Sequence, residues 1–192
     1  IEDVVNDLEN LGLLNSVKIT RYYGGVYFSF KQALEMDIIL NWIDGIINAK
    51  EKDKYLAAVL SAASDIVNTV GKQFAQPINP RDGKGKIKRG LKQRIEKDRT
   101  LSFIESFKKW LDVYSNEGSE GNVIIKNDYI KGIDMLSDDI KVVYADPPYT
   151  RYHYSRYYHV LESICLRVNP ELSYVKIKGV NKISRGIYRE GR

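Results

Sequence analysis

The sequence has little of several residue types, and each shortage excludes a class of protein. It contains one cysteine, which rules out the disulfide framework of small secreted domains. No apolar run approaches the roughly 20 residues of a membrane-spanning helix, and no signal peptide is visible. The histidines and the cysteine show no metal-ligand spacing, so no metal site is predicted. These shortages favour a cytoplasmic globular protein without a membrane partner.

The charge is mild in total but unevenly placed. With 192 residues, of which 43% are hydrophobic, the chain can bury one core, or one core with a helical addition. The net charge is +5, yet residues 81–99 hold nine basic and three acidic residues and carry +6 alone. We predict a flexible loop there whose cations contact nucleic-acid phosphates. The alternative is a solvated surface loop.

Apolar periodicity predicts a helical first half of the chain. We expect helices over four ranges: 1–14, 29–48, 54–70 and 100–114. Residues 17–28 are predicted to form an irregular hairpin or loop, and residues 72–90 a long loop. Ser29 is the expected cap of the second helix. The expected inner face of that helix consists of Leu34, Ile38, Trp42 and Ile46.

The pattern changes after Asn122 to alternating strands and helices. Strands are predicted at 123–125 and 142–144, and helices at 130–136 and 154–168. This order is half of a doubly wound sheet, so the predicted fold class is α/β. The predicted domains are an N-terminal helix and irregular hairpin (1–29), a helical insert (30–120) and an α/β half (121–192).

The most informative motif follows the second predicted strand. Val142, Val143 and Tyr144 run into Asp146-Pro147-Pro148-Tyr149, where the prolines must end the strand. A carboxylate and an aromatic ring would then project from the carboxyl edge of the sheet, where ligands bind in open α/β folds. A rigid turn capped by Asp146 is the alternative interpretation.

This motif resembles the catalytic motif of the amino-methyltransferases, which methylate an exocyclic base nitrogen with S-adenosylmethionine. By that resemblance, the Asp146 carboxylate and the Pro147 carbonyl accept the two hydrogens of the amine, whose lone pair then attacks the sulfonium methyl group. Pro147 and Pro148 fix the backbone. Tyr149 offers a face on which a flipped base can stack. The chemistry is positioning and electrostatics without a covalent enzyme intermediate.

The chain resembles most closely the Dam-like adenine-specific DNA methyltransferases of restriction–modification systems. Beyond the motif, runs 27–37 and 154–162 are similar to that family. The resemblance implies a Rossmann-like sheet, double-stranded DNA as substrate and a possible cognate restriction endonuclease. It also implies that Asp128, or less directly Asn127, contacts the cofactor; an Asx turn is the alternative for Asp128. The residues expected to contact DNA are Lys84, Lys86, Lys88, Arg89, Lys92, Arg94, Arg151 and Tyr152.

One feature of that family is missing. The family binds S-adenosylmethionine through a Gly-rich turn of the form Phe-x-Gly-x-Gly, which does not occur here. Since the chain also opens at Ile1 without an initiator methionine, we expect a piece of a longer enzyme that alone binds the cofactor weakly or not at all. The alternatives are methylation of RNA or of cytosine N4, and an inactive DNA-binding domain or subunit that retains the motif.

Two further side chains carry predictions. His159 is expected to be a partly buried, hydrogen-bonded histidine rather than a catalytic base. Cys165, on an apolar helix face, is expected to be a buried packing thiol, which disfavours a cysteine-nucleophile route. His153 is predicted to contact DNA or to face solvent.

Overall fold

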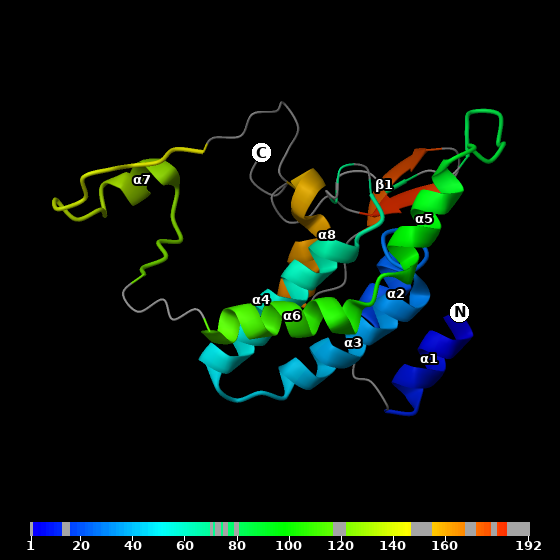
Figure 1. Ribbon diagram of the computed structural model, residues 1–192, viewed down its shortest axis with the longest axis horizontal. Helices are drawn as coiled ribbons and strands as arrows, with labels where there is room; N and C mark the ends of the chain where they lie inside the picture. The colour runs from blue at the N-terminus through cyan, green and yellow to red at the C-terminus, as the bar shows by residue number, and fades with distance from the viewer. Residues whose placement is uncertain are drawn as a thin grey trace.

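A computed structural model shows a helical body and an arm that projects from it (Figure 1). The structure describes residues 2–12, 16–69, 71, 74, 77–78, 81–116, 122–146, 155–167, 172–177 and 180–183. The predictions for Pro147, Pro148, Tyr149, Arg151, Tyr152 and His153 lie outside these residues.

Eight helices and one hairpin make up the regular structure of the described residues. The helices are α1 (Glu2–Asn10), α2 (Lys18–Tyr23), α3 (Phe30–Asp44), α4 (Ala49–Ile66), α5 (Leu91–Thr100), α6 (Phe103–Asn116), α7 (Tyr129–Ile133) and α8 (Ser155–Leu166). The strands β1 (Leu172–Ile177) and β2 (Val180–Ile183) pair antiparallel, with Leu172 opposite Ile183 and an irregularity between Ser173 and Lys176. The sequence patterns did not predict this hairpin.

The predicted α/β fold class is wrong. The described residues contain no parallel sheet, and the runs 123–125 and 142–144 are not strands. Their side chains are open to solvent, with Ile124 94% and Tyr144 86% exposed. Strand-forming residues become a strand only where a neighbour completes the hydrogen-bond ladder and a face is buried. The described part of the chain supplies neither to these two runs.

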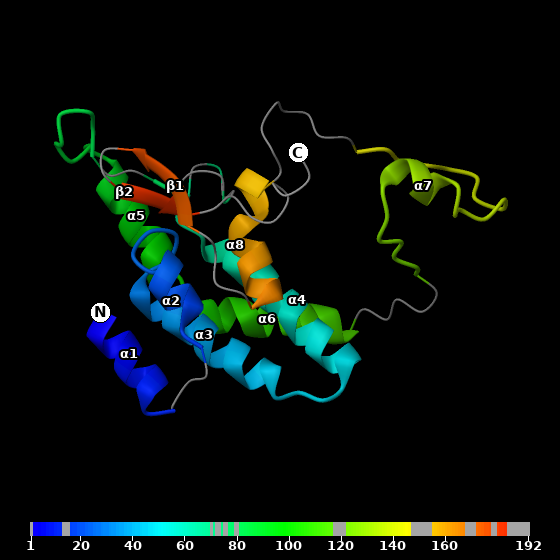
Figure 2. The same ribbon diagram turned by 180° about the vertical axis from the view of Figure 1, so that it is seen from behind.

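These two runs belong to the arm, which we define as residues 122–146. The arm includes α7 and lies apart from the helical body in both views (Figures 1 and 2). The short helix predicted at 130–136 is present as α7, but it has no buried residue. The arm therefore has no core of its own among the described residues.

The cap predicted at Ser29 is confirmed, whereas the helix predicted over 54–70 is shifted and ends at Ile66. The Ser29 side chain accepts a hydrogen bond from the Gln32 backbone, and the Gln32 side chain accepts one from the Ser29 backbone, which forms a capping box at α3. Helix α4 begins earlier than predicted because Asn48 accepts from the Glu51 backbone amide. Helix α6 matches its prediction, with Phe103 and Phe107 buried.

The inner face predicted for α3 is wrong at two positions. Ile38 and Trp42 are exposed at 49% and 55%, whereas Met36, Leu40 and Ile43 are buried. The buried face of α3 also contains Gln32 and Asp37. A prediction from apolar periodicity places such polar residues on the solvent side of a helix. Here both are buried because they have hydrogen-bond partners inside the protein.

Residues 17–28, predicted as a hairpin or loop, contain the helix α2. Val17, the residue before α2, provides no side-chain cap. Instead, the Asp37 carboxylate of α3 accepts hydrogen bonds from the backbone amides of Ile19 and Thr20, at 3.0 and 2.8 Å. An acceptor from another helix thus satisfies the first amides of α2, and a local pattern could not reveal it.

The core lies where α2, α3, α4 and α6 meet, with α8 against it. Helix α6 packs along α4, and α3 contacts α2, α4 and α6. Val160 and Ile164 of α8 are fully buried in the same cluster. The largest wholly buried side chains are Tyr23, Phe28, Phe103, Ile19, Met36, Leu40, Ile43, Ile66 and Ile164. The body is therefore held by helix-on-helix packing.

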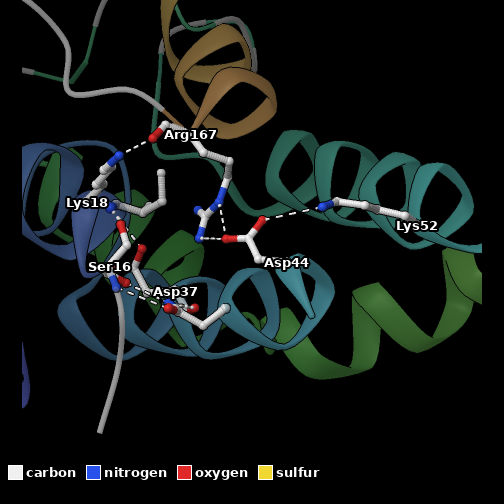
Figure 3. A network of polar contacts seen from close by, with 8 residues as sticks. Ser16, Lys18, Asp37, Asp44, Lys52 and Arg167 are labelled. Carbon is white, nitrogen blue, oxygen red and sulfur yellow. Dashed lines mark hydrogen bonds and ion pairs between the residues drawn. The ribbon is translucent and has the colours of Figure 1, made fainter. Parts of the chain in front are cut away.

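A polar network closes the end of α8 onto this body (Figure 3). Arg167 follows α8, and its Nε and Nη2 atoms bind one oxygen of Asp44 at 3.0 and 2.9 Å. The ammonium group of Lys18 donates to the Arg167 carbonyl, and Lys52 lies 4.0 Å from the second Asp44 oxygen. The ends of α3 and α8 and the start of α2 are thereby joined.

Candidate nucleic-acid interface

The basic segment, residues 81–99, is part loop and part helix. Its first five cations lie on a tight turn, and its last four lie on α5. The turn is closed by an antiparallel bridge between Arg81 and Ile87 and by the Asp82 amide, which donates to the Lys86 carbonyl. The prediction that all nine cations lie on one flexible loop is therefore wrong for the part in α5.

The turn directs four cations into solvent. The Asp82 carboxylate accepts from the backbone amides of Lys84 and Lys86, at 2.8 and 2.9 Å, which fixes the tip. The turn presents the side chains of Lys84, Lys86, Lys88 and Arg89. None of these four side chains has a hydrogen bond or ion pair to a residue that the structure describes. Unpaired cations on an ordered turn are available to phosphates.

Helix α5 is attached to the body by two arginines and one glutamine. Arg94 donates to the Thr69 carbonyl at 3.1 Å, and Arg99 donates to the Gly25 carbonyl at 2.6 Å. The buried Gln32 amide of α3 donates to the carbonyls of Asp98 and Leu101, both at 2.9 Å. Arg94, predicted to contact DNA, thus has a structural hydrogen bond as well. The helix holds its cations in fixed register.

A pocket lies between α5 and the rest of the body. Its volume is about 640 Å³, within the range of ligand sites. The lining residues come from the turn after α2, from residues 77–78, from the basic turn and from one face of α5: Gly25, Val26, Pro77, Ile78, Ile87, Lys92, Ile95, Glu96 and Arg99. We refer to it as the α5 pocket. Five of these lining residues are aliphatic, and three are charged: Lys92, Glu96 and Arg99.

Sequence reasoning found the cations of α5 but missed the pocket. The spacing of Lys92, Ile95, Glu96 and Arg99 places them on one helix face and could have indicated a mixed surface. The residues opposite them come from positions 25–26, 77–78 and 87. Only the tertiary structure brings these three segments together.

Among the motif residues, the structure describes Asp146. Asp146 lies at the end of the arm and is exposed. The arm, with α7, lies at the opposite end of the molecule from α5 in both views (Figures 1 and 2). In this structure, Asp146 and the basic segment are therefore not brought together into one site.

Asn127 and Asp128, predicted to contact the cofactor, form the cap of α7. The Asp128 carboxylate accepts from the Ile130 amide at 3.0 Å, and the Asn127 side-chain oxygen accepts from the Asp128 amide at 2.9 Å. Both side chains are exposed. These contacts support the Asx-turn interpretation and do not build a cofactor site. The role in cofactor binding stays a prediction.

The prediction for His159 is confirmed, and the prediction for Cys165 is wrong. His159 is buried, and its Nε2 atom lies 3.3 Å from the Tyr27 hydroxyl, so the prediction of a hydrogen-bonded histidine is confirmed. Cys165 is exposed, so the prediction of a buried packing thiol is wrong. Near His159, burial raises the pKa of Tyr23 to about 12, and its hydroxyl lies 2.7 Å from the Ser163 hydroxyl. This buried polar set links α2 to α8.

The chain was compared with family models, with curated proteins and with solved structures. No family model, no curated protein and no solved structure matches it. Among the described residues, no helix has the length and apolar character needed to cross a membrane. The same residues hold no cluster of three or more potential metal ligands.

Proposed function

We propose that this chain belongs to an S-adenosylmethionine-dependent methyltransferase that acts on the N6 amine of adenine in double-stranded DNA, in the cytoplasm. The observation that carries DNA binding is the ordered basic turn, whose four cations pair with none of the described residues. The motif 146–149 carries the choice of reaction. A cognate restriction endonuclease is the expected functional partner.

The proposed reaction uses acceptors rather than a tuned base. The Asp146 carboxylate and the Pro147 carbonyl accept the two amine hydrogens and make the nitrogen lone pair available for attack. S-adenosylmethionine would supply the methyl group. The amine proton leaves to solvent after methyl transfer.

The first test concerns Asp146. In the protein as it occurs in the cell, Asp146→Ala should abolish transfer of labelled methyl groups to DNA while DNA affinity stays within a few-fold. The reason is that the substitution removes an acceptor for the amine without removing a phosphate contact. Asp138→Ala, another exposed aspartate of the arm, is the control and should retain activity. Methylation that persists in Asp146→Ala contradicts the assignment, as does a wild type that methylates no DNA.

The second test concerns the basic turn. Replacing Lys84, Lys86, Lys88 and Arg89 by glutamine should weaken DNA binding and lower the salt dependence of the affinity, by about four in the log–log slope if each cation contacts one phosphate. Lys31, Lys50, Lys108 and Lys126 lie outside the basic segment, and their replacement by glutamine is the charge-matched control. Binding isotherms at several salt concentrations measure the slope. An unchanged slope in the basic-turn variant would contradict a role in DNA binding and support the alternative of a solvated surface loop.

An inactive DNA-binding domain is the second candidate. It is favoured by the separation of the arm from α5 and by the local hydrogen bonds that Asn127 and Asp128 make at the start of α7. Both candidates expect DNA binding through the turn. Methyl transfer separates them, because the inactive domain shows the salt dependence without transfer.

A further inference from the structure

The α5 pocket combines features that a phosphate contact alone does not need. Its aliphatic walls include Val26 and Ile87, which are 45% and 61% exposed. Exposing such side chains to water is unfavourable, and a concave apolar surface marks a binding site. The pocket opens beside the basic turn, because Ile87 belongs to both. Its ligand is therefore expected to be an apolar group attached to a polyanion.

The two cations of the pocket, Lys92 and Arg99, lie on the same helix, about two turns apart. Lys92 and Arg99 are seven residues apart, so their backbone positions are separated by about 10 Å along α5. Ile95 lies between them and faces the pocket. Arg99 uses one Nη2 hydrogen for the Gly25 carbonyl, and its remaining N–H groups can donate to an anion. Lys92 lies 3.6 Å from Glu96, both at the edge of the pocket.

We propose that the α5 pocket receives one unstacked base of a DNA strand, distinct from the adenine that Asp146 would hold, while Lys92 and Arg99 hold the phosphates on either side of it. The inference deepens the proposed function and rests on its DNA binding. The apolar faces of a base can lie against Ile78, Ile95 and Val26, as extruded bases lie against apolar side chains. The basic turn then holds the same strand beyond the pocket.

The chemistry of the pocket favours a base over a second phosphate contact or a purely apolar ligand. A phosphate needs donors, whereas the pocket walls at Val26, Ile78 and Ile95 are aliphatic. A purely apolar ligand would gain nothing from Lys92 and Arg99. A nucleotide has both parts, and unstacking its base costs a few kcal/mol, least where the base is unpaired. The DNA expected to bind this pocket best is thus a duplex with a single unpaired base.

The test uses a duplex with one 2-aminopurine opposite an abasic site. Stacked 2-aminopurine is quenched, and no aromatic ring is among the described residues that line the pocket. Binding of the wild-type chain should therefore increase the emission. Ile95→Gln should reduce the emission to that of the free duplex while DNA affinity, measured by anisotropy, stays within a few-fold. Ile47→Gln, at a position that is 99% exposed and outside the pocket, is the matched control and should behave as wild type.

A second pair of variants tests the cations. Lys92→Gln should reduce both the emission increase and the salt slope, the latter by about one. Lys97→Gln, on the same helix but not lining the pocket, should leave the emission increase unchanged. Duplex binding without an emission increase, or an increase that Ile95→Gln does not reduce, overturns the pocket assignment and leaves the proposed DNA binding intact. Absence of duplex binding overturns both.

Discussion

At the scale of the residue, single buried polar side chains decide how helices meet. Asp37 is fully buried, and its two oxygens accept the first amides of α2. Burial, the largest effect, raises the pKa of Asp37, against the hydrogen bonds from Thr20 and Ile19 and the charge of Arg167. A single carboxylate thus serves as the missing cap of a neighbouring helix.

The raised pKa of Asp37 predicts how stability depends on pH. The folded state binds the Asp37 proton more tightly than the unfolded state does, so protonation of Asp37 stabilises the fold. This contribution to the unfolding free energy is fully present below the ordinary carboxyl pKa of 3.8 and is lost as pH rises through the pKa of Asp37 in the folded state. Asn cannot ionise. The difference in unfolding free energy between the wild type and Asp37→Asn should therefore decrease from about pH 4 upward, in urea titrations. A difference that increases with pH contradicts the prediction. Asp138→Asn, exposed on the arm, is the control.

At the scale of the element, the attachment of α5 depends on Gln32. The cap role of Ser29 was predictable from its position before a helix, but the reach of Gln32 to the ends of α5 was not. The partners Asp98 and Leu101 are more than sixty positions away in the chain. Local patterns contain no information on such a pair.

Exchanging the Gln32 amide for a carboxylate tests this attachment. Gln32→Glu keeps the acceptor for the Ser29 amide but places a carboxylate oxygen against two carbonyl oxygens, so a loss of about 3 kcal/mol in unfolding free energy is expected. Hydrogen exchange should show amide protection lost in α5 more than in α4. Gln93→Glu, exposed on α5, is the matched control. Equal loss of protection in both helices would contradict this role.

At the scale of the whole molecule, the body and the arm differ in how their apolar residues are used. In the body, apolar faces of several helices meet in one core. In the arm, the exposed large apolar residues are Val123, Ile124, Tyr129, Ile130, Ile133, Met135, Leu136, Ile140, Val142, Val143 and Tyr144. Side chains that stay exposed gain little from the hydrophobic effect on folding. The arm therefore contributes little to the stability of the body.

Limited proteolysis tests this division. Trypsin should cut after Lys126, Lys131 or Lys141 before it cuts within the helices of the body, because these backbone positions belong to the exposed arm. Lys54, inside α4, should be cut later. Mass spectrometry of a time course identifies the first cuts, and circular dichroism should show that the helical body persists. First cleavage within α4 would contradict the division.

The sequence by itself determined the uneven distribution of charge along the chain, the helix cap at Ser29 and the presence of the helices α3, α4 and α6. Each of these features depends on residues a few positions apart. The tertiary structure decided that α3 turns Gln32 and Asp37 inward, that α2 is a helix, and that α5 closes a pocket over residues 25–26 and 77–78. It also decided that the runs 123–125 and 142–144 are not strands. A strand needs a partner, and a buried polar group needs an acceptor or a donor, and both are supplied by distant parts of the chain.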